Sequence, residues 1–522
     1  MPRVIESDVC IIGSGISAAM VAEKLAEERA ATIVVVEAGD ESDRLSQRPG
    51  LRRRFLDYGE SPWHNDHLDG YEVAEIQSRS MQVGGLAMHW GGVTPRFSPE
   101  DFKLRSLYGV GTDWPLSYEE LDPWYQEAEV RLGVAGEQGP VELDPRGRPF
   151  PLEPIPLSYN LLRLREWVTQ AGIPMWSQPS AKNSVAYRGR PACCRNDTCT
   201  PVCPIGAKYS PDFTWDALRK AERVRLLPRT VVRRLVKTGS GEKISHATAI
   251  ARDGGGELEF RAKTFVVAGG YVWSSHLLLL SGVANRSGLV GRYLTGHRNV
   301  SGYVSLPIRL YPGMNGQHSL VSKKFMRVPR GERYLRHDLR VWESSVGREP
   351  RLMDAQGRLL LGDELLADWR RRTATGAARV RAYYDVIPDR DSALTLDHSK
   401  RTPWGDPLPQ LGWRDAPESA ALRAWSEERI RALFAELARA GGGEMISTRS
   451  DSFQDHPAGG CRMGSDPATS VTDAWGRTHE HENLFIAGAP TCVSGGCANA
   501  TLTFCSLSLR TAAELGKEFP AR

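Results

Sequence analysis

The sequence predicts a mixed α/β fold, in which a Rossmann-like nucleotide-binding domain is discontinuous and holds an inserted domain built on an antiparallel sheet. Three observations lead to this prediction. A βαβ unit opens the chain within residues 9–37, two further apolar strands run into glycines at 264–268 and 483–487, and 522 residues exceed what a single hydrophobic core usually supports. A nucleotide domain with strands at both ends and in the middle must be interrupted by another domain.

The βαβ unit is readable element by element. Residues 9–12 form a short apolar run of the kind found in buried parallel strands, and the segment Gly13-Ser14-Gly15-Ile16-Ser17-Ala18 follows as a tight turn. Residues 19–29 are rich in strong helix formers. A second apolar strand at 32–36 ends in Glu37, 22 residues beyond Gly15. The order of strand, turn, helix and strand favours a dinucleotide site.

Each residue of this turn has a physical role at such a site. Gly13 permits the turn, Gly15 lets the backbone approach a pyrophosphate, and the small Ala18 lets helix and strand pack closely. The helix N-terminus offers unpaired N–H groups and the positive end of its dipole. Glu37 can accept hydrogen bonds from an adenosine ribose. The alternative is a glycine turn that binds no ligand, and the pattern alone does not separate FAD from NAD.

The domain organisation follows from the positions of these strands. We expect residues 1–99, 206–297 and 451–522 to form the nucleotide-binding domain. Residues 100–205 and 298–450 would then form the inserted, substrate-binding domain.

Two local patterns add detail to the inserted segments. The capping box Ser117-Tyr118-Glu119-Glu120 predicts a helix through Glu129. A turn followed by alternation at 389–396 predicts a strand of the substrate domain.

Composition excludes several classes of function. Lys and Arg number 67 against 63 Asp and Glu, and the basic residues are dispersed, so we expect no nucleic-acid partner. No apolar run approaches the roughly 20 residues that span a bilayer. The first residues lead directly into a strand, which leaves no room for an export signal.

Three long motifs resemble those of the glucose–methanol–choline (GMC) oxidoreductases, flavoenzymes that oxidise alcohols. They are Val83-Gly84-Gly85-Leu86-Ala87-Met88-His89-Trp90, residues 108–134 and residues 483–503. Within the family the chain is most similar to sugar dehydrogenase catalytic subunits and pyranose 2-oxidase. The resemblance implies FAD as cofactor. It also implies further FAD contacts from Gly84, Gly85, His89, Trp90, Val232, Gly488 and Ala489.

The resemblance also assigns the catalytic residues. His456 in the stretch 455–464 stands where the family has its catalytic histidine, and Asn499 in the stretch 497–503 stands at the second catalytic position. Oxidising a sugar C–H requires removal of the hydroxyl proton, and imidazole has an unperturbed pKa near working pH. Asn499 can hold the same hydroxyl without competing for its proton. The alternative for His456 is a structural role, since eleven other histidines occur in the chain.

The motif containing His89 leaves the type of flavin attachment open. In pyranose 2-oxidase a similar His-Trp motif carries the flavin covalently, whereas related dehydrogenases hold it without a covalent bond. The segment Ala487-Gly488-Ala489 lacks the acidic residue that many family members have there.

Four of the nine cysteines fall within eleven residues, at 193, 194, 199 and 203. Their spacing differs from that of a zinc finger. Clustered thiolates with a proline directly after the last one occur in iron–sulfur ligation, although this spacing is neither the bacterial nor the plant ferredoxin pattern. The stretch 191–209 resembles the segment that binds a three-iron (3Fe-4S) cluster in membrane-linked sugar dehydrogenases. That resemblance implies Cys193, Cys199 and Cys203 as ligands, with Cys194 spare. The alternatives are a structural zinc, a disulfide or free thiols.

The expected function is therefore that of an FAD-dependent sugar or glycoside dehydrogenase that oxidises a pyranose ring hydroxyl and passes electrons through an iron–sulfur cluster to an external acceptor. One alternative is an oxygen-using pyranose or glycoside oxidase without a cluster. Another is an electron-carrying flavoprotein without substrate chemistry. The resemblance further implies a small signal-bearing subunit and a cytochrome acceptor, so the enzyme would be cytoplasmic or carried to the periplasm with its partner.

Overall fold

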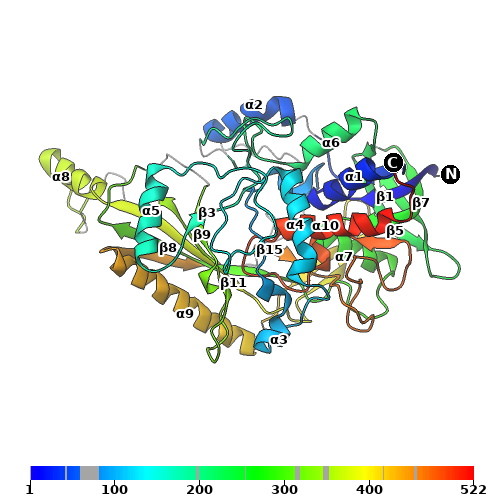
Figure 1. Ribbon diagram of the computed structural model, residues 1–522. Helices are drawn as coiled ribbons and strands as arrows, with labels where there is room; N and C mark the ends of the chain where they lie inside the picture. Colours follow the sequence, from blue (N-terminus) through cyan, green and yellow to red (C-terminus); the bar gives the residue numbers. More distant parts are fainter. Residues whose placement is uncertain are drawn as a thin grey trace.

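The computed structural model describes residues 2–41, 44–58, 81–195, 199–200, 202–252, 254–311, 318–344, 352–354, 356–415, 417–451 and 455–522. Two large sheets lie side by side, and both chain termini lie at the outer end of the first sheet (Figure 1). The predicted mixed α/β class is confirmed.

The first sheet has the order β4-β2-β1-β7-β6-β5, and β16 also pairs with β7. Strands β1, β2, β4, β7 and β16 are parallel, whereas β5 and β6 join antiparallel. The long strand β7 makes this possible, because its first part pairs with β6 and its last part with β16. The bounds are β1 Arg3–Ile12, β2 Ile33–Val36, β4 Arg225–Leu227, β5 Thr230–Lys237, β6 Ile244–Ala251, β7 Glu257–Val267 and β16 Leu484–Ile486.

Helices cover both faces of this sheet. Helices α1 (Ile16–Glu28), α6 (Pro211–Lys220) and α10 (Thr501–Gly516) pack on one face, around the fully buried Trp215. Helix α7 (Gly270–Ser281) packs on the other face through Leu277 and Leu278. Both faces of a parallel sheet are thereby buried, which explains why its strands are continuous apolar runs.

The second sheet is largely antiparallel, with the order β14-β8-β11-β10-β9-β3, and β15 pairs with β8. Helices α5 (Tyr159–Gln170) and α9 (Pro417–Ala440) pack on one face of it. The strands are β3 Trp176–Ser177, β8 Thr295–Leu306, β9 Leu320–Ser322, β10 Leu339–Ser344, β11 Gly376–Asp385, β14 Glu444–Ser450 and β15 Asp455–Ala458.

The strand expected at 389–396 is found but not in that sheet. It is β12 (Ala393–Arg401), which among the described strands pairs with β13 (Pro407–Gly412). Leu394 of β12 packs against helix α7, which covers the first sheet. The assignment of this strand to the substrate domain therefore stays a prediction.

The predicted capping box is confirmed at helix α4 (Tyr118–Leu132), where Ser117 and Glu120 bond each other's backbone N–H. Helix α4 packs against α10, and α10 packs against α1 (Figure 1). The remaining helices are α2 Arg44–Tyr58, α3 Leu104–Tyr108, α8 Gly362–Thr373 and the 3₁₀ turns η2 Gly85–Met88, η3 Pro99–Phe102, η4 Lys324–Met326 and η5 Ala489–Thr491. Among the described helices, none is both long and apolar enough to cross a membrane.

The two sheets are joined by the C-terminal part of the chain. Residues 455–458 form β15 in the second sheet, whereas 484–486 form β16 in the first. The domain bounds themselves remain a prediction. Strand β8 extends across the expected bound at residues 297 and 298, and β15, which lies within the segment 451–522, pairs with β8 in the second sheet.

Candidate active site

The turn between β1 and α1 has the geometry that a pyrophosphate requires. Gly13 has a φ of +100°, and a Cβ there would lie 2.7 Å from the carbonyl oxygen of Ala268. A Cβ on Gly15 would meet nothing within 4 Å, and no side chain caps helix α1 at this residue. The N-terminus of α1 therefore has space beside Gly15 and no side-chain cap, which suits a bound phosphate group.

Glu37 lies beside this turn at the end of β2. Its carboxylate accepts hydrogen bonds from the backbone N–H of Ser14 at 3.0 Å, from the Ser14 hydroxyl at 2.7 Å and from the N–H of Gly39 at 2.8 Å. Burial raises the pKa of Glu37. Ser14 thus holds the Glu37 carboxylate in place. Nothing in the sequence of the Gly-Ser-Gly turn predicts this role of Ser14.

The other predicted contacts approach the same turn. The Gly84 N–H donates to the Ser14 hydroxyl at 3.1 Å, and a Cβ on Gly85 would lie 3.2 Å from Cα of Gly15. A side chain on Gly488 would overlap Ser17 on α1.

Val232 and Ala489 lie on elements that adjoin this edge. Val232 lies two residues after Thr230, whose N–H donates to the Glu37 carbonyl at 2.8 Å. The carbonyl of Ala489 accepts from Gly459, which ties η5 to the segment after His456. The residues at this edge fit a dinucleotide.

The side chains of His456 and Asn499 lie in direct contact. The Asn499 Nδ2 donates to His456 Nε2 at 2.6 Å, and His456 Nδ1 lies 2.8 Å from Nε2 of His297. With Nε2 accepting from the amide, the ring proton of His456 is on Nδ1 and donates to His297. The Asn499 Oδ1 is buried without a hydrogen-bond partner in the described part of the chain. This oxygen can accept from a substrate hydroxyl.

The backbone of His456 is in the left-handed region, with a φ of +49°. This conformation is uncommon for a residue other than glycine and persists where surrounding contacts fix it. Here the contacts are the bonds to His297 and Asn499, together with the ring of Tyr383 at 5.9 Å.

His297 and Tyr383 are site residues that the sequence does not reveal. They lie on β8 and β11, 4.5 Å apart between ring centroids. Each follows ordinary strand alternation, so only the pairing of β15 with β8 brings them to His456.

The cysteines predicted as ligands share one region without forming a preorganised set. Cys193 and Cys199 are partly buried and Cys203 is buried. Cys193 interacts electrostatically with both others, and burial raises its pKa. Among the described residues, however, the three sulfurs do not all lie within 4.8 Å of one another. Residues 196–198 and 201 of this stretch lie outside the described residues.

A buried cation connects this region with the His-Trp motif. Lys208 is 1% exposed, donates to the Trp90 carbonyl, and interacts electrostatically with Cys199 and Cys203. Burial lowers the pKa of Lys208 to about 7. Trp90 in turn donates from Nε1 to the Tyr209 carbonyl at 2.8 Å. Among the described residues, no carboxylate forms an ion pair with Lys208. In its charged form the amine favours thiolates nearby, so the donor chemistry here fits an anionic metal–sulfur group.

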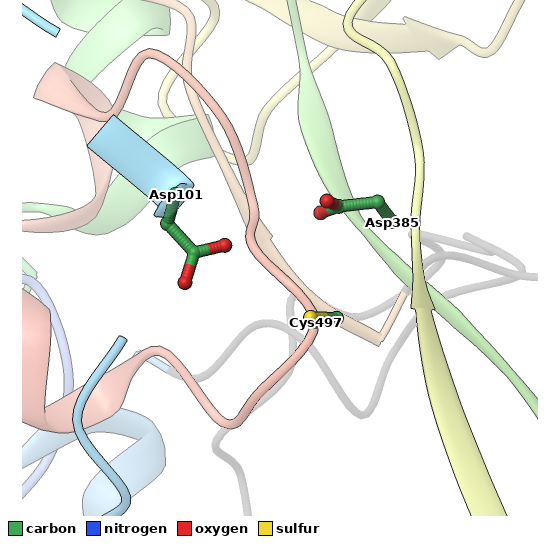
Figure 2. A group of neighbouring side chains, drawn as sticks. All are labelled: Asp101, Asp385 and Cys497. Carbon is green, nitrogen blue, oxygen red and sulfur yellow. The ribbon is translucent and has the colours of Figure 1, made fainter. Parts of the chain in front are cut away.

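A second grouping of metal-type ligands consists of Asp101, Asp385 and Cys497, which point toward one another from three elements (Figure 2). The guanidinium of Arg336 already supplies its positive charge, at 2.9 Å from Asp101 and 2.6 Å from Asp385. Arg336 is fully buried. We call Arg336, Asp101, Asp385 and Cys497 the ion cluster. Since Cys497 lies two residues before Asn499, the ion cluster helps to fix the position of the segment that carries Asn499.

The turn between β1 and α1 is suited to a phosphate group, and His456 of the second sheet contacts Asn499. These features together are typical of two-domain, dinucleotide-dependent oxidoreductases. Models of the GMC oxidoreductases match residues 181–299 and 388–508. The fructose dehydrogenase large subunit of Gluconobacter japonicus is 33% identical, over 97% of both chains. The 6'''-hydroxyparomomycin C oxidase of Streptomyces lividus is 30% identical, over 98% of this chain and 92% of the relative.

A solved structure agrees in fold. Pyridoxine 4-oxidase from Mesorbium loti superposes with a TM-score of 0.62 at 18% identity, over 97% of this chain and 98% of its own. The chain belongs to the GMC oxidoreductase family. The predicted family and enzyme class are confirmed, and the nucleotide site is assigned to FAD.

The mode of FAD attachment gives a first prediction. We expect acid precipitation of the holoenzyme to release free FAD, because His89 belongs to a motif that dehydrogenases with a cysteine stretch use without a covalent bond. Absorbance of the supernatant measures the released flavin. A yellow precipitate that becomes colourless in His89→Ala would instead show a covalent bond at His89.

Proposed function

We propose that the protein is the catalytic subunit of an FAD-dependent sugar or glycoside dehydrogenase that oxidises a ring hydroxyl. The observation that carries this proposal is the pair of His456 and Asn499, bonded at 2.6 Å. The two relatives above support the substrate class, since one is a fructose dehydrogenase subunit and the other oxidises an aminoglycoside.

The chain's own residues would perform the proton chemistry. A substrate hydroxyl takes the place of the Asn499 amide at Nε2 of His456, and that nitrogen removes the hydroxyl proton. Asn499 then orients the alcohol by donating from Nδ2 to the alcohol oxygen. His297 accepts from Nδ1 and so stabilises the imidazolium that forms. FAD, held by Gly13, Gly15 and Glu37, supplies the hydride acceptor.

An electron route to an outside acceptor is the finer part of the proposal. Cys193, Cys199 and Cys203 would hold a 3Fe-4S cluster, which supplies one-electron transfer. Support comes from the tether between this region and the His-Trp motif through Lys208 and Trp90. The Gluconobacter relative is a large subunit, which supports a partner subunit here, and we propose the small signal-bearing chain as that partner. A cytochrome would accept the electrons.

The second prediction separates this route from the hydride step. Cys199→Ser should abolish transfer to an external acceptor and spare flavin reduction by sugar, because proton removal depends on His456. Anaerobic stopped-flow reduction and a dye-linked steady-state assay measure the two steps separately. Cys194→Ser, a change at the exposed neighbouring thiol, is the matched control and should retain both.

Analysis of iron and sulfide decides between the two enzyme classes. Wild-type protein prepared anaerobically should contain FAD, iron and sulfide. Protein that contains FAD without iron and sulfide would exclude the proposed electron route through a 3Fe-4S cluster. It would favour the alternative, an oxygen-using oxidase without a cluster.

A further inference from the structure

Helices α5 and α9 cover one face of the second sheet, and several charged side chains lie on the opposite face. Along β11, Val380, Ala382 and Tyr384 pack in the core with α9, so the alternate residues Arg379, Arg381 and Tyr383 project from the opposite face. Arg379 pairs in register with Trp342 of β10, and Arg381 with Arg340. Three arginines therefore lie on neighbouring positions of the face that leads to His456.

Arg379 has no carboxylate partner among the described residues. Its guanidinium lies over the rings of Trp342 at 4.8 Å and Tyr303 at 5.9 Å, and its nearest hydrogen bond is a long one of 3.5 Å to Ser301. Its Nε is buried without a hydrogen-bond partner. Burial, assisted by the charge of Arg381, lowers the pKa of Arg379. The side chain thus holds a half-buried positive charge that lacks an anion.

Arg340 repeats this pattern closer to the catalytic pair. It is 4% exposed, and its Nε donates to Asp338 at 2.6 Å. Its Nη2 is buried and has no partner in the described part of the chain. The guanidinium lies 4.5 Å from the ring centroid of Tyr383. The Asp338 carboxylate therefore accepts from Nε of Arg340, and Nη2 of Arg340 has no acceptor among the described residues.

Tyr383 connects the arginines to the reacting atoms. Arg381 donates from Nη1 to the Tyr383 hydroxyl at 2.9 Å, and the Tyr383 ring lies 5.9 Å from that of His456. The other carboxylates of this region are engaged elsewhere: Asp385 with Arg336, and Asp451 with Arg449. The charge of Arg379 is thus not neutralised by either.

We propose that the substrate is an anionic sugar, whose carboxylate or phosphate binds Arg379 and Arg340 while its hydroxyl faces His456. This inference rests on the proposed function and narrows its substrate class. A guanidinium forms paired hydrogen bonds to either anion, and buried N–H groups without partners favour an anion over a neutral hydroxyl. The ring of Trp342, 4.8 Å from the Arg379 guanidinium, offers an aromatic face on which a sugar ring can stack.

The test uses three ligands that differ only at one carbon: glucose, glucuronate and glucose 6-phosphate. Binding is measured by anaerobic calorimetry on photoreduced holoenzyme, which cannot oxidise them. The account expects glucuronate or glucose 6-phosphate to bind at least about tenfold more tightly than glucose, and Arg379→Gln to reduce that preference by about tenfold. Tighter binding of glucuronate would identify the anionic group of the substrate as a carboxylate, and tighter binding of glucose 6-phosphate would identify it as a phosphate.

Arg371→Gln on helix α8, whose side chain is 78% exposed, makes the same change in net charge and should keep the preference. Equal binding of all three ligands by the wild type, no binding of any, or a preference that Arg379→Gln leaves intact would overturn the proposal. Flavin reduction by the same sugars is recorded separately. Anion-selective binding without flavin reduction would therefore contradict the proposed oxidation and leave the anion site standing.

Discussion

His456→Ala should retain FAD and slow flavin reduction by sugar by roughly a hundredfold or more, the usual scale for losing a general base. Nε2 of His456 is held as a proton acceptor by the Asn499 amide on one side and by the bond from Nδ1 to His297 on the other. Stopped-flow absorbance under anaerobic conditions measures the rate.

Two further variants serve as a control for His456→Ala and as a test of the role of His297. His398→Ala removes an exposed histidine on β12 and should reduce its flavin at the wild-type rate. His297→Ala should have a smaller effect than His456→Ala and should shift the pH profile of reduction, because His297 acts through the orientation of His456. Near-normal reduction in His456→Ala would remove this residue from the mechanism.

Arg336→Met should lower the free energy of unfolding by about 3–5 kcal/mol, the scale for breaking a buried ion pair by removing one partner. Arg336 is fully buried between Asp101 and Asp385, and also donates to the Met326 carbonyl at 2.7 Å and to Ser98 at 2.9 Å. Without it, two carboxylates stay buried beside the Cys497 thiol, whose pKa burial already raises. Urea unfolding measures the change.

The control for this variant is Arg371→Met, where an exposed ion pair to Asp368 is lost. It should change the unfolding free energy by no more than about 0.5 kcal/mol. A triple variant that also carries Asp101→Asn and Asp385→Asn should regain part of the loss, because the uncompensated charges are gone. An unfolding midpoint for Arg336→Met equal to that of the control would contradict the role of this ion cluster.

Local patterns in the sequence predict the elements whose structure is decided locally. The glycine turn requires a positive φ at Gly13, and helix α4 begins at its capping box, so both can be predicted from a few neighbouring residues. Strand β12 shows the limit of this approach. Its alternation is real, but among the described strands its partner is β13, and alternation alone does not say which sheet a strand joins.

The rest of the candidate site depends on contacts between distant segments. His297 lies 159 residues before its partner His456, and Arg336 lies over two hundred residues after Asp101. Nothing in the local sequence of His297, Tyr383 or Arg379 distinguishes them from other strand residues. Their roles follow from sheet register, which brings them to one face, and from burial, which makes their charges and hydrogen bonds consequential.

If the protein oxidises a sugar as proposed, a sugar C–H bond is broken with its hydride leaving for the flavin while His456 takes the hydroxyl proton. Anaerobic flavin reduction by a saturating sugar, and by the same sugar deuterated at every carbon, measures this step. We expect the oxidised flavin absorbance to be lost without oxygen, severalfold more slowly with the deuterated sugar. A flavin that stays oxidised with every sugar, anionic or neutral, would exclude sugar oxidation and favour an electron-carrying flavoprotein.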